Sequence, residues 1–198
     1  MPTIRCATSN PGKLREFRMA AEHLGFRDIE ILPLEDLKSI APPEEEGETF
    51  EENAIDKALY YSVFCEEPVF ADDSGLQVDA LGGQPGVYSA RYAGPSATDR
   101  ENNRLLLQRL NDKTDRTARF VCVIALAQRG KLIATFRGAV EGKIIDEERG
   151  PQGFGYDPLF YYEPFGCTFG EAEADRKMQV SHRGEALLAM LKSVAGSV

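Results

Sequence analysis

The pattern of hydrophobic and polar positions along the chain changes repeatedly between the period of a strand and the period of a helix. Residues 3–7 and 68–71 form short apolar runs that predict buried strands. Residues 118–127 are apolar on both sides, as a central strand is. A polar turn at 128–131 then leads into 132–141, which we expect to return as the partner strand. The sheet should therefore contain at least one hairpin.

Helices are predicted at four places between and after these strands. The first starts at Pro11, where a helix tolerates proline, with Asn10 as its N-cap. Thr49 opens a second helix with a capping-box sequence, and two more cover 98–110 and the stretch from Gly184. The inner face of the second helix is expected to hold Phe50, Ala54, Leu59 and Tyr61. Strands and helices that intermix in this way argue for an α/β domain with a mixed sheet.

The bulk composition narrows the possible partners. A chain of 198 residues is long enough for one domain with a sizeable core, so we expect residues 1–198 to form a single domain. The chain has no run of about 18 apolar residues and no secretory signal at its start, which predicts a cytoplasmic protein without a membrane partner. The net charge of −9 disfavours binding to nucleic acid. A small polyanion can still bind where local cations and a metal ion offset its charge.

The first motif with chemical content is TSNPGK, residues Thr8 to Lys13, at the junction of the first strand and the first helix. Backbone N–H groups at a helix start attract phosphate, and Lys13 adds a full positive charge. The motif is not a P-loop, which requires GxxxxGK[ST]. The alternative is a capped helix with one exposed lysine.

Carboxylates gather in two other segments. Asp72 and Asp73 come directly after the apolar run 68–71, followed by Ser74 and a glycine. Adjacent side chains on an extended strand point to opposite sides, so one carboxylate can face a site while the other supports a turn. Oxygen ligands of this kind suit Mg²⁺, and one glutamate of the run Glu44–Glu46 could supply a second carboxylate. The alternatives are an ordinary Asp-Gly turn and a solvated loop.

Two further motifs lie in the last quarter of the chain. Residues 150–158 hold three glycines and two prolines around two aromatic residues and an acid. Glycines let the backbone approach a flat ligand, and aromatic rings offer a stacking face for a base, although a glycine-rich turn with core aromatics has the same composition. Lys177, His182 and Arg183 follow, and arginine suits planar, bidentate recognition. A lone histidine is more often structural.

The order of these motifs along one chain is more specific than any one of them. The sequence resembles the inosine triphosphate pyrophosphatase family in TSNPGK, EEEGETFEENAIDKA, ADDSGLQVDALGGQPGVYSARYAG, GFGYDPLF and K-x4-HRG. The resemblance runs from residue 3 to about 190, and the block from Ala71 to Gly94 is its most distinctive part. It implies an elongated α/β fold, in which a mixed sheet flanked by helices forms two lobes with a nucleotide cleft between them, and it implies a homodimer. It also implies Mg²⁺-dependent hydrolysis of ITP, dITP and XTP to the monophosphate and pyrophosphate.

The same resemblance implies roles for particular residues. Asp73 would be the base that activates water and also a metal ligand. Glu44 would be the second metal carboxylate, with Glu45 as a close competitor. The phosphates would be held by Thr8, Ser9, Asn10, Pro11, Gly12 and Lys13. Substrate would also contact Ser74, Phe154, Gly155, Tyr156, Asp157, Lys177, His182 and Arg183. Ser9 stands where many relatives have glycine; serine keeps the backbone donor and adds a hydroxyl.

Two other functions remain open from the sequence. One is a pyrophosphatase for pyrimidine or other modified nucleotides on a related fold. The other is a nucleotide-binding module without turnover. Asp73 together with an available glutamate argues against the module, because binding alone has no need of a base.

Overall fold

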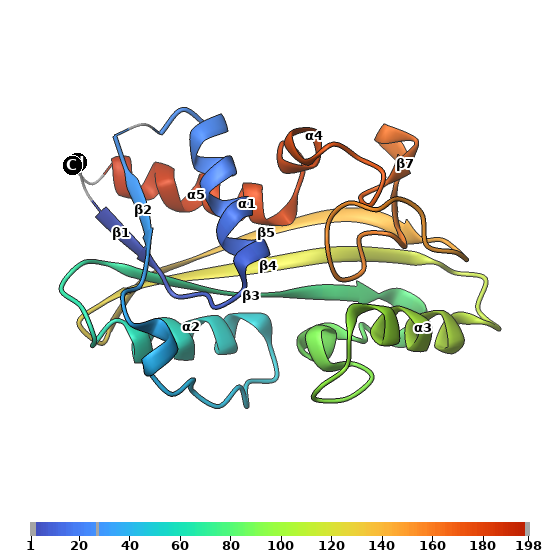
Figure 1. Ribbon diagram of the computed structural model, residues 1–198, viewed down its shortest axis with the longest axis horizontal. Coiled ribbons are helices and arrows are strands. Elements are labelled where there is room, and N and C mark those ends of the chain that lie inside the picture. The colour runs from blue at the N-terminus through green and yellow to red at the C-terminus, as the bar shows by residue number, and fades with distance from the viewer. Residues whose placement is uncertain (1–2, 27, 197–198) are drawn as a thin grey trace. The chain divides into compact units, whose positions relative to one another are not determined.

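The computed structural model describes residues 3–26 and 28–196, and within these residues the strands form one seven-stranded sheet in the order β2-β1-β3-β4-β5-β6-β7 (Figure 1). The strands are β1 Thr3–Cys6, β2 Glu30–Pro33, β3 Val69–Val78, β4 Thr117–Gln128, β5 Lys131–Ile144, β6 Phe160–Tyr162 and β7 Cys167–Thr168. The main helices are α1 Pro11–His23, α2 Phe50–Tyr61, α3 Asp99–Leu110, α4 Ala174–Met178 and α5 His182–Ala195. β1 is parallel to β2 and β3, whereas β6 is antiparallel to β5 and β7. The predicted α/β fold with a mixed sheet is confirmed.

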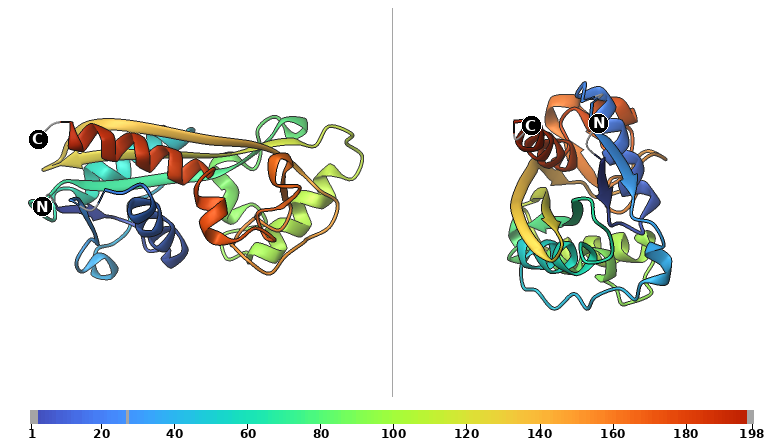
Figure 2. Two further views of the ribbon diagram at one scale, coloured as in Figure 1. Left: turned by 90° about the horizontal axis from the view of Figure 1, so that it is seen from above. Right: turned by 90° about the vertical axis from the view of Figure 1, so that its left-hand side faces the viewer.

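The chain divides into two compact units. Unit 1 holds the described parts of Met1–Asp73, Cys122–Gly138 and Ser181–Val198, and unit 2 holds Ser74–Val121 and Ala139–Val180. In unit 1, α1 and α5 lie together on one face of the sheet and α2 covers the other face (Figures 1 and 2). No helix of the described residues is both long and apolar enough to cross a membrane.

The helix starts agree with the capping signals. The Asn10 side chain accepts hydrogen bonds from the backbone of α1, and Thr49 forms a complete capping box at α2. The predicted inner face of α2 is correct for three residues and wrong for Leu59, which is only half-buried. Asn53 and Ala58 are buried instead, because the stripe that begins at residue 50 continues with residues three, four, eight and eleven positions later.

The expected turn at Asp72-Asp73-Ser74-Gly75 is wrong, because β3 runs straight through these residues to Val78. Gly75 serves a close approach rather than a turn. A Cβ at this position would collide with Ser89 and would lie 2.7 Å from the carbonyl oxygen of Gly86. The Ser89 hydroxyl accepts a hydrogen bond from the Leu76 N–H at 2.9 Å and donates to the Gly86 carbonyl. Tertiary packing has therefore overridden a local turn signal.

The remaining elements differ from the predictions mainly at their ends. β4 and β5 form the predicted hairpin, each slightly longer than expected. α5 starts at His182 rather than Gly184, with the Ser181 side chain as its N-cap. Four short elements were not predicted, namely β2, α4, β6 and β7. Of these, β6 and β7 pack on the core of unit 2, in which Phe160 and Phe169 are fully buried.

Candidate active site

The loop between β1 and α1 carries the predicted phosphate motif. Two of its N–H groups are occupied here, since Asn10 Oδ1 accepts from Gly12 N at 2.8 Å and from Lys13 N at 3.2 Å. The Lys13 ammonium donates to Asp72 Oδ2 at 2.8 Å. Thr8 lies half-buried before them, and Ser9 and Pro11 are exposed. The loop thus places one lysine and several exposed polar groups at the start of α1.

Asp72 and Asp73 have separate partners, as adjacent residues of an extended strand should. Asp73 Oδ1 accepts from the Lys57 ammonium at 3.0 Å, and Asp73 Oδ2 accepts from Asn53 Nδ2 at 3.2 Å. The Lys57 ammonium also donates to Glu45 Oε1 at 3.0 Å. One ammonium group therefore joins the strand carboxylate to the acidic loop.

The two aspartates also differ in their electrostatics. Burial raises the pKa of the Asp73 carboxyl, and the nearby Lys57 offsets this only in part, so the pKa stays above its usual value. Burial acts in the same direction on Asp72, but the charges of Lys13, Arg183 and Lys57 outweigh it and hold the pKa of Asp72 below its usual value. Asp72 is thus a fixed anion, whereas Asp73 is the stronger base of the two.

Burial lowers the pKa of Lys57, but three carboxylates, those of Asp73, Asp72 and Glu45, outweigh burial and raise it overall. The Lys57 ammonium is therefore a stable cation. Lys57 and Asn53 were missed as site residues in the sequence analysis. They lie one helical turn apart on α2, and Asn53 is a polar residue within the buried stripe, which was the available signal.

A second buried ion pair joins α5 to α1. Arg183 Nη1 donates to Glu16 Oε2 at 2.8 Å, and the side chains are 7% and 11% exposed. Glu16 lies one turn after Lys13 on α1 and was not predicted as a site residue. Arg183 and its neighbour His182 are both buried in the first turn of α5. The predicted residues of the first motif, Asp73, His182 and Arg183 all belong to unit 1.

Unit 2 contains the other group of predicted residues. Asp157 Oδ2 accepts from the Lys177 ammonium at 2.7 Å and from the Phe154 N–H at 2.9 Å. The Lys177 ammonium also lies 5.5 Å from the centre of the Phe154 ring, within cation–π range. The Tyr156 ring is buried, and its hydroxyl donates to the Ser89 carbonyl at 2.8 Å. The structure thus brings Phe154, Asp157 and Lys177 together. Ser74 lies in β3 and belongs to the same unit.

The glutamate run and the strand carboxylate fit a cation. Among the described residues, no group of three or more histidine, cysteine, aspartate or glutamate side chains is gathered as a metal site. Mg²⁺ needs fewer, because it usually takes one or two carboxylates together with substrate phosphates and water. Asp73 and Glu45 each lie 3.0 Å from the Lys57 ammonium, so the two carboxylates are spaced to share one cation. Glu44 is exposed.

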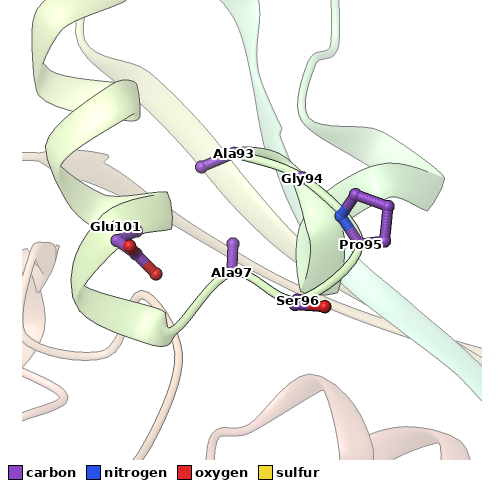
Figure 3. Close-up of a pocket in the computed structure, with 6 residues that line it drawn as sticks. All are labelled: Ala93, Gly94, Pro95, Ser96, Ala97 and Glu101. Carbon is purple, nitrogen blue, oxygen red and sulfur yellow. The ribbon is translucent and has the colours of Figure 1, made fainter.

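Unit 2 also has a pocket of about 430 Å³, which is lined by Ala93, Gly94, Pro95, Ser96, Ala97 and Glu101 (Figure 3). None of the predicted site residues lines it. Its carboxylate, that of Glu101, accepts hydrogen bonds from the N–H and hydroxyl of Thr98 at 2.7 Å and 2.8 Å. That carboxylate caps α3, so the pocket offers no comparable chemistry.

The mixed sheet and the two clusters of buried lysine, arginine and carboxylate groups define an α/β protein whose polar groups suit an anionic, phosphorylated ligand. Residues 4–193 match the sequence profile of the Ham1 family, and the chain belongs to that family.

Relatives and solved structures extend over nearly the whole chain. A dITP/XTP pyrophosphatase of Syntrophobacter fumaroxidans is 50% identical over 92% of this chain and 77% of the relative. A dITP/XTP pyrophosphatase of Geobacter sulfurreducens is 48% identical over 99% of this chain and 98% of the relative. The structure of a HAM1 protein from Coxiella burnetii aligns with a TM-score of 0.88 at 40% identity, covering 99% of this chain and 100% of that one. A nucleoside-triphosphatase / dITP/XTP pyrophosphatase from Mycobacterium abscessus aligns with a TM-score of 0.75 at 38% identity, covering 96% of this chain and 98% of that one.

Proposed function

We propose that this protein hydrolyses non-standard purine nucleoside triphosphates, namely ITP, dITP and XTP, to the monophosphate and pyrophosphate. The observation that carries the proposal is the pair of Asp72 and Asp73, in which one carboxylate is a fixed anion beside Lys13 and the other is a more basic group beside Lys57. The relatives named dITP/XTP pyrophosphatase support it. Release of pyrophosphate from ITP in a single-turnover assay tests it. If ITP binds and no pyrophosphate is released, the protein is a nucleotide-binding module without turnover.

The phosphates are bound at the start of α1 in this proposal. Lys13 supplies a positive charge there, and the polar groups of Thr8, Ser9 and Asn10 donate further hydrogen bonds after the Asn10 cap rearranges. Pro11 and Gly12 complete the turn into the helix. Asp72 holds the Lys13 ammonium at 2.8 Å, which limits its freedom before substrate arrives.

Asp73 takes the proton of the attacking water. The water oxygen bonds to the α-phosphorus, the bond from that phosphorus to the bridging oxygen breaks, and pyrophosphate leaves the monophosphate. The proton taken from water then passes from Asp73 to solvent. Asn53 and Lys57 hold the two carboxylate oxygens at 3.2 Å and 3.0 Å, so they orient the base. Ser74 follows directly on the same strand and contacts substrate in this scheme.

Mg²⁺ is the proposed cofactor, held by Asp73 and by Glu44 or Glu45. The contact of Glu45 with Lys57 supports Glu45, whereas the motif spacing favours Glu44. When bound, the ion offsets negative charge on the phosphates. The absence of a cysteine or histidine cluster among the described residues favours a hard cation over zinc.

We expect hydrolysis to require a divalent hard cation and to stop in excess chelator. The variants Glu44→Gln and Glu45→Gln then show which of the two glutamates binds the metal. The variant that removes the ligand should need at least about 10-fold more Mg²⁺ for half-maximal rate, since even groups behind a ligand are worth about 10–100-fold in metal affinity. The other variant serves as its matched control. Full turnover of the wild type in chelator would remove the metal from the mechanism.

The purine ring of the substrate is recognised by the remaining predicted residues. Phe154 stacks on the purine, since the Tyr156 ring is buried in the core of unit 2 and its hydroxyl is held by Ser89. Gly155, with φ of 62°, allows the turn to approach the ligand closely. Asp157 and Lys177 hold that turn. His182 and Arg183 donate hydrogen bonds to the substrate.

We also propose a homodimer located in the cytoplasm. Val63, Phe64, Leu132 and Ile133 are exposed large apolar residues of unit 1, which supports a partner for this surface. The segments that carry them are adjacent, because Arg129 N and Gly130 N donate to Ser62. Light scattering should give the mass of two 21.9 kDa chains at micromolar concentration. Ile133→Glu should shift the mass toward one chain; a wild type that already has the mass of one chain contradicts the dimer.

A further inference from the structure

The turn at Phe154–Asp157 is held from two sides, and only one of them belongs to the predicted site. On the first side, Asp157 Oδ2 accepts from the Phe154 N–H and the Lys177 ammonium. On the second side, α3 holds both backbone groups of Gly155. Asp99 Oδ2 accepts from the Gly155 N–H at 2.7 Å, and Asn103 Nδ2 donates to the Gly155 carbonyl at 3.2 Å.

Asp99 and Asn103 match the N–H and the carbonyl of Gly155 in spacing and in polarity. They are four residues apart on α3, so they lie on the same side of the helix. The carboxylate can only accept and meets the N–H group, whereas the amide NH₂ donates and meets the carbonyl. The 2.7 Å distance from Asp99 is that of a charge-assisted hydrogen bond. Gly155 has a φ of 62° and no side chain, so no side-chain packing of its own holds its backbone groups.

The Asn103 amide is committed to this role. It is 3% exposed, and its NH₂ group also donates to Glu148 Oε1 at 2.7 Å. The Glu148 carboxylate and the Gly155 carbonyl are both acceptors, so the Asn103 amide cannot flip to present its oxygen to them. Its oxygen has no hydrogen-bond partner within residues 3–26 and 28–196. Both hydrogen bonds of the side chain to other residues use its NH₂ group, so Asn103 acts here as a donor.

α3 is a firm support for the turn. It starts with a complete capping box at Thr98 and buries Leu106 and Leu110 fully. The neighbouring Asn102 is equally buried but faces another segment, where it accepts from Ala93 N at 2.8 Å and donates to the Ala90 carbonyl at 3.2 Å. Consecutive asparagines of one helix therefore hold different loops.

We propose that Asp99 and Asn103 are positioning residues that fix the Gly155 peptide and thereby set the choice between purine bases. The proposal rests on the function given above, in which the Phe154–Asp157 turn contacts the base. Neither residue needs to touch the substrate. Loosening the turn lets a base with an extra 2-amino group be accommodated, so selectivity for ITP over GTP falls while chemistry at the phosphates continues.

Asp99→Ala should lower the ITP-to-GTP ratio of kcat/KM by about 10-fold, the factor carried by one charge-assisted hydrogen bond. The kcat for ITP should stay within about threefold, as for an exposed substitution. Asp99→Asn keeps an acceptor and should recover most of the ratio. Asn103→Ala should act in the same direction as Asp99→Ala. The matched control Asn102→Ala should lower the melting temperature without changing the ratio.

Hydrogen exchange of the Gly155 amide gives a readout that is independent of turnover. Exchange should speed up by about 10-fold in Asp99→Ala and remain unchanged in Asn102→Ala. Unchanged Gly155 exchange overturns the proposal, as does an equal loss of activity on ITP and GTP that follows the melting temperature. A wild type that releases no pyrophosphate from ITP refutes the proposed function and the claim on selectivity, while the exchange experiment still decides whether Asp99 positions the turn.

Discussion

Replacing Asp73 with asparagine should lower kcat for ITP by about 10²–10⁴, the usual range for a lost general base, while nucleotide binding persists. Asparagine has nearly the same shape and can still accept from Lys57 with its amide oxygen, but it cannot take a proton. The carboxylate it replaces has a raised pKa, mainly because it is buried, and is therefore the more basic of the adjacent pair. Single-turnover pyrophosphate release and equilibrium binding of ITP separate the two effects.

The control for this variant is Asp56→Asn. Asp56 is exposed on α2, next to Lys57 in sequence, so its replacement removes one negative charge from the same helix without touching the site. Its kcat should remain within about threefold of the wild type. An Asp73→Asn enzyme that also stays within about threefold, against the expected loss, would remove Asp73 from the mechanism. A fall in melting temperature without a fall in kcat would assign it a structural role only.

Local signals predicted much of the fold because they act over a few residues. Asn10 and Thr49 cap their helices as expected, and the apolar run at 118–127 is the buried strand β4. The course of β3 could not be predicted in the same way. Its Asp-Asp-Ser-Gly sequence favours a turn locally, and the strand continues because Gly75 packs against Gly86 and Ser89, a contact made by tertiary structure alone.

The partners of the site residues were hidden for a similar reason. Lys57 and Asp73 are 16 positions apart, and Glu16 and Arg183 are 167 positions apart. No periodicity within one element joins residues at such separations. The motifs therefore predicted the strand carboxylates and the lysine of the first loop as site residues. They did not predict Lys57, which contacts Asp73, or Glu16, which contacts Arg183. The local hints were a carboxylate on the buried side of α1 and an asparagine in the buried stripe of α2.

The kcat/KM for ATP should fall below that for ITP by about 10⁴ or more, as in sites built around hydrogen bonds to one substrate. Inosine and xanthosine carry a keto oxygen at position 6, which only accepts hydrogen bonds, whereas adenosine carries an amino group there, which donates. The residues proposed to contact the nucleobase offer hydrogen-bond donors, namely His182 and Arg183. Against adenine such a donor stays unpaired, and each buried unpaired group costs about 1–3 kcal/mol.

GTP is harder to exclude than ATP. Guanine keeps the 6-keto oxygen and differs from hypoxanthine by a 2-amino group, so its exclusion depends on shape and on an unmatched donor at position 2. The expected order is therefore ITP, dITP and XTP first, GTP well behind them, and ATP, CTP and UTP last. Phe154 should contribute affinity without choosing among purines, because every purine presents a face for stacking. Phe154→Leu should accordingly raise KM for ITP and GTP by similar factors.

The measurement is pyrophosphate release from each triphosphate at equal low concentration with Mg²⁺, compared as kcat/KM. Asp73→Asn, assayed on the same panel, controls for contaminating phosphatases, since it should lose activity on every substrate in proportion. If the kcat/KM for ATP or a pyrimidine triphosphate matched that for ITP, the proposed selection of non-standard purines would be wrong. That would hold even if Asp73 and the metal act as proposed. The donor groups of His182 and Arg183 would then serve the phosphates or the fold, because a donor aimed at position 6 cannot treat a keto oxygen and an amino group alike.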